Sequence, residues 1–459
     1  MNILNDMPLK DMAQDASNMK SHYLKKIEDV ETLRMMWEEH PLDSTVGNAL
    51  ARAIAQKPIL EQDSKLMDSV INFFDMDRSK FAATLKPVSV FKDRYIVSLL
   101  FPFLAKSLEP TPGTKVNQSI LDLYAGIRMA VDTLKALGID IELRSYDTER
   151  NVETTRKILQ MEEVKSSDLL VGPLFPNQLD LVREFSINNR INMINPVSSN
   201  FDFVSENPFG ILFLPSYETI GRQSAKWMAS QLKNKNCMVF FGDTPKDSVA
   251  AYAFMEKARE LELNLVWAEE VSVEKSATIF SRLATPVEYD EFKNPIEFEL
   301  KIDSIGGIFV ASDNALIYTK VISGVETRGD SVLVMGNKTW LDNAAANFET
   351  YERLHITMAA PNFIQEKSVA YQKFRKEFLQ HHKNLPTEYS SIGFEFMMFV
   401  GQALSKHGAY FQDGIRAEDF IDGYMSLGYK FEDLPTNEYV PFIHFENGEL
   451  HVLNPKGLE

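Results

Sequence analysis

Two short polar segments are candidates for ligand binding, because each follows directly on a short apolar run. They are Gly172–Gln178 and Val197–Asn200, within the stretch LLVGPLFPNQLDLVREFSINNRINMINPVSSN. The first begins with a glycine that lets a ligand come close to the backbone, and the second offers hydroxyl and amide groups for hydrogen bonds. Small polar residues and proline are also what ordinary β-to-α loops use as turn formers and helix caps. With two such segments after neighbouring strands, binding and purely local roles are about equally supported.

The sequence carries none of the common catalytic or nucleotide-binding motifs, namely H-E-x-x-H, G-x-S-x-G, G-x-x-x-x-G-K-[ST] and G-x-G-x-x-G. His381 and His382 are adjacent in a predicted helix and point about 100° apart, so they cannot chelate one metal from a single face. The single cysteine, Cys237, opens the apolar run CMVFF and is predicted to be a buried core residue. We therefore predict a protein that is not an enzyme and that uses no cofactor and no metal.

Composition narrows the function classes further. The chain has 459 residues, of which 44% are hydrophobic, so about three folding units with several cores are expected. Its formal net charge of -17 and pI of about 5.1 argue against nucleic acid as a partner, because phosphate binding needs a basic face. The first residues, MNILNDMPLK, contain no apolar leader segment and no lipid-accepting cysteine. No apolar run approaches the roughly 20 residues of a transmembrane helix.

The chain divides into an α-helical beginning and a long α/β part. Residues 1–86 show helical spacing of apolar residues and predict a small helical domain, which could be a tetratricopeptide-like fragment although no 34-residue repeat is evident. From Tyr95 onward, apolar strands alternate with amphipathic helices, which predicts parallel sheets covered by helices on both faces. The acidic, aromatic segment PVEYDEFKNPIEFELKIDS (286–304) is expected to form a helix or a hairpin. Asn447-Gly448 predicts a hairpin turn near the end of the chain.

In an open parallel sheet, ligands bind beyond the carboxyl ends of the strands, where the strand order reverses. Both polar segments of the opening stretch are expected at that place.

The segment VGPLFPNQLDLVREFSINNRINMINPVSSN resembles the corresponding part of type I periplasmic binding proteins, the leucine/isoleucine/valine-binding family. The segment YQKFRKEFLQHHKNLPTEYSSIGFEFMMFVGQALSKHG (371–408) is similar to a late helix pair of that family. The resemblance runs over roughly residues 92–454 and implies two lobes that close on a ligand by a hinge motion. It implies one lobe of residues 90–210 plus 358–425, a second of 215–350, and C-terminal strands 426–459 near the hinge.

The resemblance also implies which residues line the cleft, with some departures from the family pattern. Where the family places a ligand-binding hydroxyl, this chain has Pro176, which has neither hydroxyl nor N–H. Where an acidic residue would pair with an α-ammonium group, this chain has Asn337, Lys338 and Thr339, so a cationic ligand group is expected to be repelled by Lys338. Amino-acid binding is therefore not expected. The complete set of expected cleft residues is Phe101, Pro102, Phe175, Pro176, Asn177, Val197, Ser198, Ser199, Asn200, Asp243, Lys246, Asp247, Ser312, Asp313, Asn314, Asn337, Lys338 and Thr339.

Two functions follow from this resemblance. The first is a substrate-binding protein of the ABC-transport type that holds a small polar or anionic molecule between its lobes. The second is a cell-envelope regulator that docks a peptidoglycan synthase or another protein, because a helical domain ahead of this fold resembles the lipoprotein activators of penicillin-binding proteins. Both place the protein in the periplasm or cell envelope, and both are compatible with a homodimer. Trp340, which follows the loop GNKT, could stack on a ligand ring, but core packing is favoured.

Overall fold

The computed structural model describes residues 20, 23, 24, 27, 29–56, 63–76, 81, 89–107, 115–343 and 347–456. The chain forms two compact units, Met1–Ser89 and Val90–Glu459. The first ten residues of the chain and residues 108–114 lie outside the described residues. Among the described residues, no helix is both long enough and apolar enough to traverse a bilayer.

The first unit contains the helices α2 (Val30–Glu39), α3 (Ser44–Gln56) and α4 (Ser64–Phe73). Asp29 and Asp63 cap the starts of α2 and α4, since each carboxylate accepts a hydrogen bond from a backbone N–H of the first turn. The apolar faces of the three helices meet in one core that includes Leu33, Leu50 and Val70. Helices are thus present where the apolar spacing predicted them.

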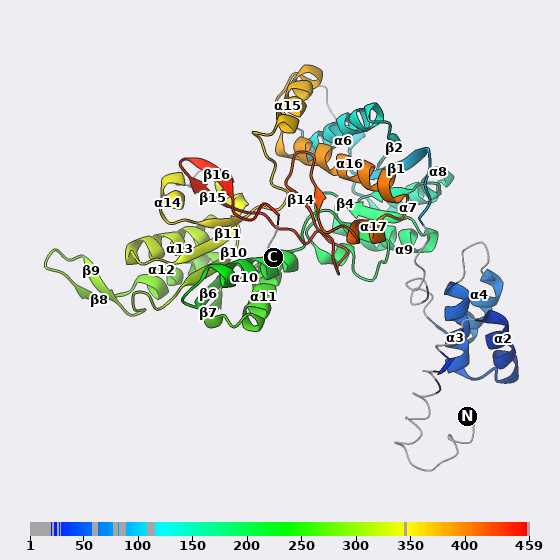
Figure 1. The fold of residues 1–459 in the computed structure, drawn as a ribbon, viewed down its shortest axis with the longest axis horizontal. Helices are drawn as coiled ribbons and strands as arrows, with labels where there is room; N and C mark the ends of the chain where they lie inside the picture. The colour runs from blue at the N-terminus through cyan, green and yellow to red at the C-terminus, as the bar shows by residue number, and fades with distance from the viewer. Residues whose placement is uncertain are drawn as a thin grey trace, which may run out of the picture. The chain divides into compact units, whose positions relative to one another are not determined.

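The second unit contains two large sheets, each covered by helices (Figure 1). The first sheet has the order β2-β1-β3-β4-β5 and is parallel throughout. Its strands are β1 (Arg94–Phe101), β2 (Asp140–Asp147), β3 (Leu169–Val171), β4 (Asn192–Asn195) and β5 (Gly210–Leu212). Strand β2 is at the edge of this sheet, and most of its residues are half-buried.

The helices of the first lobe are α6 (Gln118–Ala136), α7 (Val152–Leu159), α8 (Glu162–Lys165), α9 (Leu179–Asn189), α15 (Val369–His382), α16 (Glu388–His407) and α17 (Gln412–Arg416). Short 3-10 turns η3 (Ala105–Ser107), η4 (Pro176–Gln178) and η5 (Phe201–Phe203) and the strand pair β13 (Ile421–Asp422) and β14 (Gly428–Tyr429) complete it. Helices α6 and α16 touch backbone to backbone, because a Cβ at Gly126 would lie 1.9 Å from the carbonyl oxygen of Ser390. This contact fixes the start of α16 against the first sheet.

The second sheet has the order β16-β15-β12-β11-β10-β6-β7. Its strands are β6 (Asn236–Phe241), β7 (Asn264–Glu270), β10 (Gly307–Ala311), β11 (Leu333–Asn337), β12 (Thr357–Ala359), β15 (Phe442–Glu446) and β16 (Glu449–Val452). Helices α10 (Tyr217–Gln231), α11 (Pro245–Glu260), α12 (Ala277–Ala284), α13 (Ala315–Arg328) and α14 (Phe348–Arg353) surround it, with 3-10 turns η6 (Val273–Lys275) and η7 (Lys338–Asp342). A separate two-stranded sheet consists of β8 (Pro286–Tyr289) and β9 (Pro295–Phe298).

Two details differ from the expected division of the chain. Strand β12 pairs with β11, so the second segment assigned to the first lobe begins after this strand and not at residue 358. Strands β15 and β16 add antiparallel to β12, so the second sheet is mixed and the C-terminal strands complete it. Parallel pairing requires a long crossover, whereas the tight Asn447-Gly448 turn returns the chain at once and makes its strands antiparallel.

The segments that connect the lobes are hydrogen-bonded to each other. The backbone N–H of Leu212 donates to Pro435 O (2.9 Å), and that of Asn437 donates to Leu212 O (3.1 Å). The buried hydroxyl of Thr436 donates to Leu214 O and accepts from the N–H of Ser216. The connection between the lobes is therefore a set of paired extended segments.

Candidate functional site

The polar centre of the site is Asp313, which follows β10 at its carboxyl end. Its carboxylate accepts hydrogen bonds from Lys246 Nζ (2.5 Å), Thr339 Oγ1 (2.6 Å) and Asn337 Nδ2 (2.9 Å). Lys246 follows β6, Asn337 is the last residue of β11, and Thr339 comes just after it; β6 and β11 are the neighbours of β10 in the sheet. The adjacent carboxyl ends of three parallel strands thus bring together four residues that the sequence predicted as site residues.

Burial alone would raise the pKa of Asp313, but the hydrogen bonds from Lys246, Thr339 and Asn337 outweigh it and lower that pKa. Burial would lower the pKa of Lys246, but the hydrogen bond to Asp313 and the charge of that carboxylate raise it. Both groups therefore stay ionised at neutral pH, as an internal ion pair.

The buried side chain of Trp340 packs next to the residues that bind Asp313. Its side chain is fully buried, stacks on Tyr318 with ring centroids 4.5 Å apart, and donates from Nε1 to the carbonyl oxygen of Ser312 (2.8 Å). It also lies directly over Gly336, where an added Cβ would come within 1.9 Å of the indole ring. The prediction that Trp340 packs in the core is confirmed, and it holds the loops after β10 and β11 together.

The start of α11 contributes Lys246 and Asp247. Thr244 is the N-cap of this helix and accepts a hydrogen bond from the backbone N–H of Asp247 (3.4 Å). Burial is the largest effect on Asp247 and raises its pKa. Asp243, one residue before the cap, is exposed and does not line the pocket that lies between the two lobes.

On the first lobe, only Ser199 of the predicted loop Val197–Asn200 lines the pocket. Ser198 Oγ accepts from the N–H of Asn200, and Asn200 Oδ1 accepts from the N–H of Asp202, so both side chains are used in local turns. Asn195 was not predicted as a site residue, yet its side chain shapes this loop by accepting from the N–H groups of Val197 and Ser198 and donating to Pro173 O. An asparagine at the end of a strand, just before a proline, is a known turn former and could have indicated this role.

The other predicted first-lobe residues lie elsewhere. The ring of Phe175 is covered by the guanidinium of Arg150 at 4.0 Å, and Asn177 Nδ2 donates to Arg150 O. Phe101 is fully buried in the core of the first lobe, and Pro102 next to it is also buried. The predicted residues outside the lining of the pocket between the lobes are Phe101, Pro102, Phe175, Pro176, Asn177, Val197, Ser198, Asn200, Asp243, Ser312 and Asn314. Most of these residues pack in the core, form turns or cap helices.

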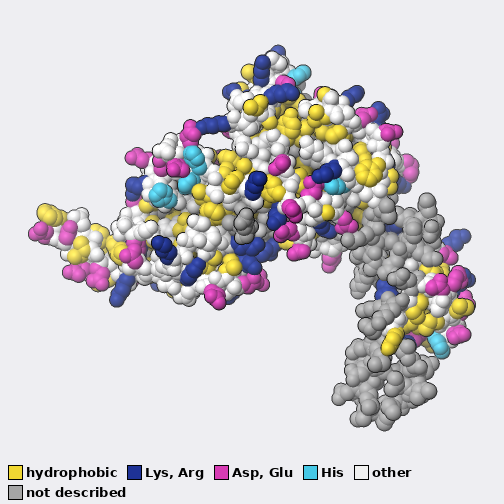
Figure 2. All heavy atoms as spheres, in the orientation of Figure 1, with side chains coloured by type: hydrophobic (Ala, Val, Ile, Leu, Met, Phe, Trp, Pro, Cys, Tyr) yellow, Lys and Arg dark blue, Asp and Glu magenta, His cyan; other side chains and the backbone are white. Residues whose placement is uncertain are grey.

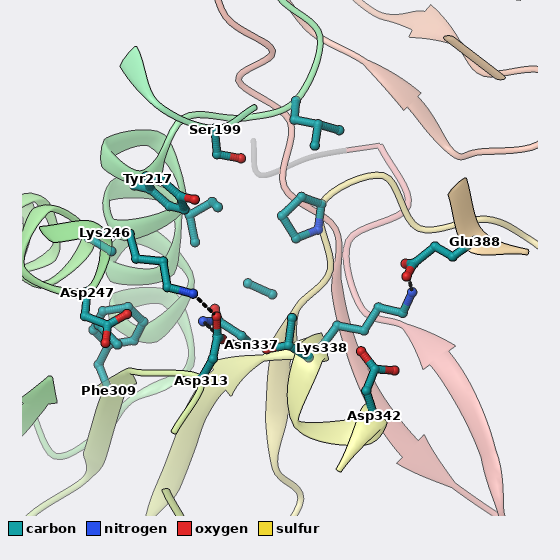
Figure 3. Close-up of a pocket in the computed structure, with 17 residues that line it drawn as sticks. Ser199, Tyr217, Lys246, Asp247, Phe309, Asp313, Asn337, Lys338, Asp342 and Glu388 are labelled. Carbon is teal, nitrogen blue, oxygen red and sulfur yellow. Dashed lines mark hydrogen bonds and ion pairs between the residues drawn. The ribbon is translucent and has the colours of Figure 1, made fainter. Parts of the chain in front are cut away.

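A pocket of about 250 Å³ lies where the two lobes face each other (Figure 3). The first lobe contributes Ser199 and Glu388, and the second contributes the Asp313 network, Asp247 and Tyr217, with burial raising the pKa of Tyr217. Lys338 Nζ lies 3.0 Å from Glu388 Oε1 at the start of α16, so an ion pair joins the two lobes across the pocket mouth. The complete lining is Ser199, Leu214, Tyr217, Ile220, Lys246, Asp247, Ala250, Phe309, Ala311, Asp313, Asn337, Lys338, Thr339, Asp342, Ala359, Pro361 and Glu388.

The charges of the pocket are largely paired internally. Its lining has two lysines and four carboxylates, a net charge of -2 when all are ionised. Lys246 is paired with Asp313 and Lys338 with Glu388, which leaves Asp247 and Asp342 as the excess. In the described ranges, no group of His, Cys, Asp and Glu side chains is arranged to hold a metal ion. Cys237 is fully buried in β6, and burial raises the pKa of its thiol to about 11, so it acts as a core residue.

The sequence profile of the family described as "Periplasmic binding protein" matches residues 117–437. An ABC transporter substrate-binding protein from Desulfitobacterium hafniense, in complex with Leu, is similar in structure with a TM-score of 0.52 at 17% identity, covering 78% of this chain and 100% of that one. A putative branched-chain amino acid ABC transporter protein from Rhodospirillum rubrum gives a TM-score of 0.58 at 14% identity, with the same coverage. No curated protein matches significantly.

These matches confirm the predicted family resemblance and the two-lobed α/β fold. The profile match also confirms the prediction of a non-catalytic binding protein. The resemblance of the N-terminal helices to penicillin-binding-protein activators is not supported by these comparisons.

Proposed function

The chain belongs to the periplasmic binding protein family, and on that premise we propose that it holds a small polar solute in the pocket between its lobes. It would serve as the substrate-binding protein of an ABC-type transport system in the periplasm or cell envelope. The observation that carries this proposal is the pocket itself, which draws hydrogen-bonding side chains from both lobes around an apolar wall. Closure of the lobes would then bury the solute.

The electrostatics of the pocket select against an anionic solute. Both lysines already have carboxylate partners, and two further carboxylates face the same space. An anion would meet this excess negative charge without a free cation to pair with in the described lining. We therefore narrow the expected ligand to a polar solute without net negative charge.

An α-amino acid remains a disfavoured ligand, but the structure provides a different reason from the one expected from the sequence. The ion pair of Lys338 with Glu388 offsets the predicted repulsion of a cationic ligand group by Lys338, and Pro176 does not line the pocket. The acidic residue against the GNKTW loop is Asp313, but Lys246 occupies the position on its carboxylate that a ligand ammonium group would need. A neutral ligand with hydroxyl or amide groups fits this arrangement better than an α-amino acid does.

The test is calorimetric titration of the protein with neutral polyols and amides, α-amino acids and aromatic acids. Ser199→Ala should weaken binding of the active compound by about tenfold, the value of one hydrogen bond, whereas Ser198→Ala is the matched control and should leave it unchanged. Equal effects of both substitutions, or tight binding of an anion, would refute the assignment of this pocket.

The cell-envelope regulator is the second candidate, and the helical first unit is the observation that favours it. Native mass spectrometry of untreated protein separates the two. A retained small molecule supports the solute-binding function, and an empty chain that also gives no heat with the solute panel supports protein docking.

A further inference from the structure

Strands β8 and β9 form a hairpin, residues 286–298, that we call the acidic hairpin. Among the described strands it pairs with no third one, and it extends away from the rest of the second lobe (Figure 1). Its turn is ordered by Asp290, whose carboxylate accepts hydrogen bonds from the N–H groups of Phe292 (2.8 Å) and Asn294 (2.7 Å). A two-stranded hairpin is marginally stable in water, and this one is attached to the core of the second lobe through Phe298 at its base.

The acidic hairpin exposes large apolar side chains. Phe292 at its turn is 77% exposed, and Val287, Tyr289 and Ile296 on its strands are 60%, 55% and 54% exposed. Figure 2 shows hydrophobic side chains at the end of this projection with acidic side chains beside them. Exposed apolar side chains gathered on one projecting element are typical of a protein contact surface.

The same hairpin concentrates negative charge. Glu288 and Glu297 lie directly opposite each other in the strand pair, and within the described residues no ion pair is formed by either one. Like charges in opposed positions destabilise a strand pair. The segment has four acidic residues against one lysine, a net charge of -3. A cation from outside the chain would relieve this repulsion.

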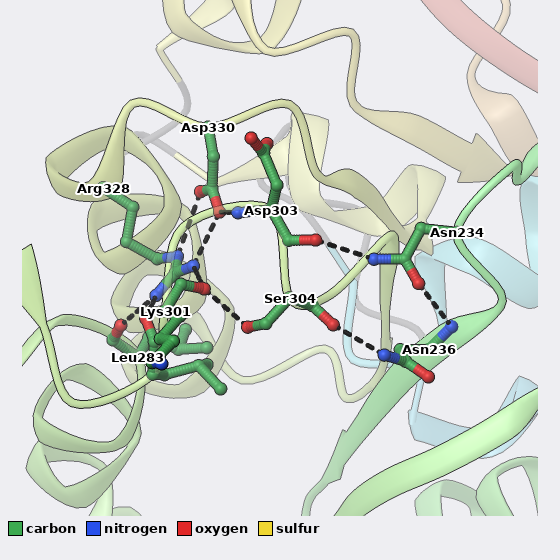
Figure 4. Close-up of polar contacts among 9 residues, drawn as sticks. Asn234, Asn236, Leu283, Lys301, Asp303, Ser304, Arg328 and Asp330 are labelled. Carbon is green, nitrogen blue, oxygen red and sulfur yellow. Dashed lines mark hydrogen bonds and ion pairs between the residues drawn. The ribbon is translucent and has the colours of Figure 1, made fainter.

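The base of the hairpin is firmly held (Figure 4). Arg328, at the end of α13, donates to Leu283 O, Leu300 O and Lys301 O on the two sides of the hairpin base. Its guanidinium also pairs with Asp330, and both side chains of this pair are fully buried. A rigid mount of this kind presents the hairpin in a fixed direction, which reduces the entropy cost of binding.

The hairpin is not suited to strand addition. Pro286 and Pro295 each remove a backbone donor, and the register between the strands is irregular. The apolar side chains toward its tip, by contrast, are exposed. Recognition would therefore use side chains and not an added strand.

We propose that the acidic hairpin docks into a protein surface with an apolar hollow bordered by lysine or arginine side chains. A second copy of this chain is a poor occupant, because it would bring its own acidic hairpin and a chain charge of -17. The hairpin precedes β10, whereas the pocket residue Asp313 follows the carboxyl end of that strand, so docking leaves the pocket open. This proposal does not depend on solute binding.

The test places the photo-crosslinker p-benzoylphenylalanine at Phe292 of the full chain in its native cells, with the same group at the exposed Leu137 of the first lobe as a position control. Glu288→Lys is the key variant, because it creates an attractive cross-strand pair with Glu297 and so cannot act by weakening the hairpin. Glu256→Lys, on the exposed side of α11, makes the same charge change elsewhere in the second lobe.

We expect one discrete adduct from position 292 and none of that mass from position 137. Glu288→Lys should reduce its yield by about tenfold through loss of charge complementarity, while Glu256→Lys changes it less than about twofold. Mapping the crosslinked peptide should show lysine or arginine next to apolar residues. The proposal is overturned by absence of an adduct, by an adduct of two copies of this chain, or by equal yields in the two lysine variants.

Discussion

Arg328→Met is expected to destabilise the second lobe more than almost any other single substitution of a charged residue in it. The guanidinium makes five hydrogen bonds, two to Asp330 (3.0 and 2.6 Å) and three to backbone carbonyls (2.9, 2.6 and 2.9 Å). Arginine has five N–H donors, so every donor is used. Methionine fills much of the volume but satisfies none of these acceptors.

The magnitude follows from burial. Both side chains of the Arg328–Asp330 pair are fully buried, and removal of one partner from a buried pair costs about 3–5 kcal/mol because the other charge is left uncompensated. We expect a loss of about 4 kcal/mol for Arg328→Met. Arg328→Met combined with Asp330→Asn removes the stranded charge and keeps an acceptor for the N–H of Asp303, so it should recover about 1–2 kcal/mol.

Urea unfolding monitored by tryptophan fluorescence measures the free energy of unfolding and reports mainly on the second lobe. The chain has four tryptophans, and Trp227, Trp267 and Trp340 all belong to the second lobe. Arg259→Met, at an exposed site on α11, is the control and should change the free energy of unfolding by less than about 0.5 kcal/mol. The reasoning fails if Arg328→Met costs less than about 1 kcal/mol, or if the double variant is no more stable than the single one.

Three further outcomes are expected. Gly126→Ala should lower the stability of the first lobe by at least about 2 kcal/mol, because the new Cβ meets the Ser390 backbone, and an unchanged melting temperature would contradict that close contact. The stability lost in Asp313→Asn at pH 7 should shrink below about pH 4, since a lowered folded-state pKa gives stability that is present above the unfolded pKa and lost as pH falls through the folded one. Urea unfolding at pH 7 and pH 3 would show this, and an identical loss at both values would be inconsistent with it. Ser198→Ala combined with Ser199→Ala should leave the melting curve nearly unchanged, because Ser198 bonds an exposed turn and Ser199 faces the pocket, so a drop of several degrees would reveal an unrecognised structural role.

The alternation of apolar strands and amphipathic helices was sufficient to predict the parallel sheets, because buried strands such as β3 and β6 are short apolar runs bounded by loops. Helix α10 was not predicted, although its buried residues Ile220, Ser224 and Trp227 recur at helical spacing. For residues 286–304 the sequence left helix and hairpin open, because Val287, Tyr289 and Ile296 are exposed and give no clear apolar period; the structure shows the hairpin.

More of the predicted residues of the second lobe than of the first line the pocket between the lobes. Asp313, Asn337 and Lys246 follow neighbouring parallel strands, a relation that the order of elements contains. Glu388 reaches the pocket only because α6 and α16 pack closely, and such a contact between distant segments leaves no local signal. Phe101 also lies at the carboxyl end of a parallel strand, but its ring packs in the core of the first lobe. The position at a strand end does not predict the direction of the side chain.

Strands β15 and β16 lie near the C-terminus of the chain, and this position affects how the second lobe folds during synthesis. Its sheet starts with β6 at Asn236 but gains its last two strands only at Phe442–Val452. Until these strands have been synthesised, β12, whose residues are all buried in the folded protein, is an unpaired edge strand. Such an edge can pair with a wrong strand. Loss of the last 20 or so residues would therefore produce an aggregation-prone chain and not merely a shortened one.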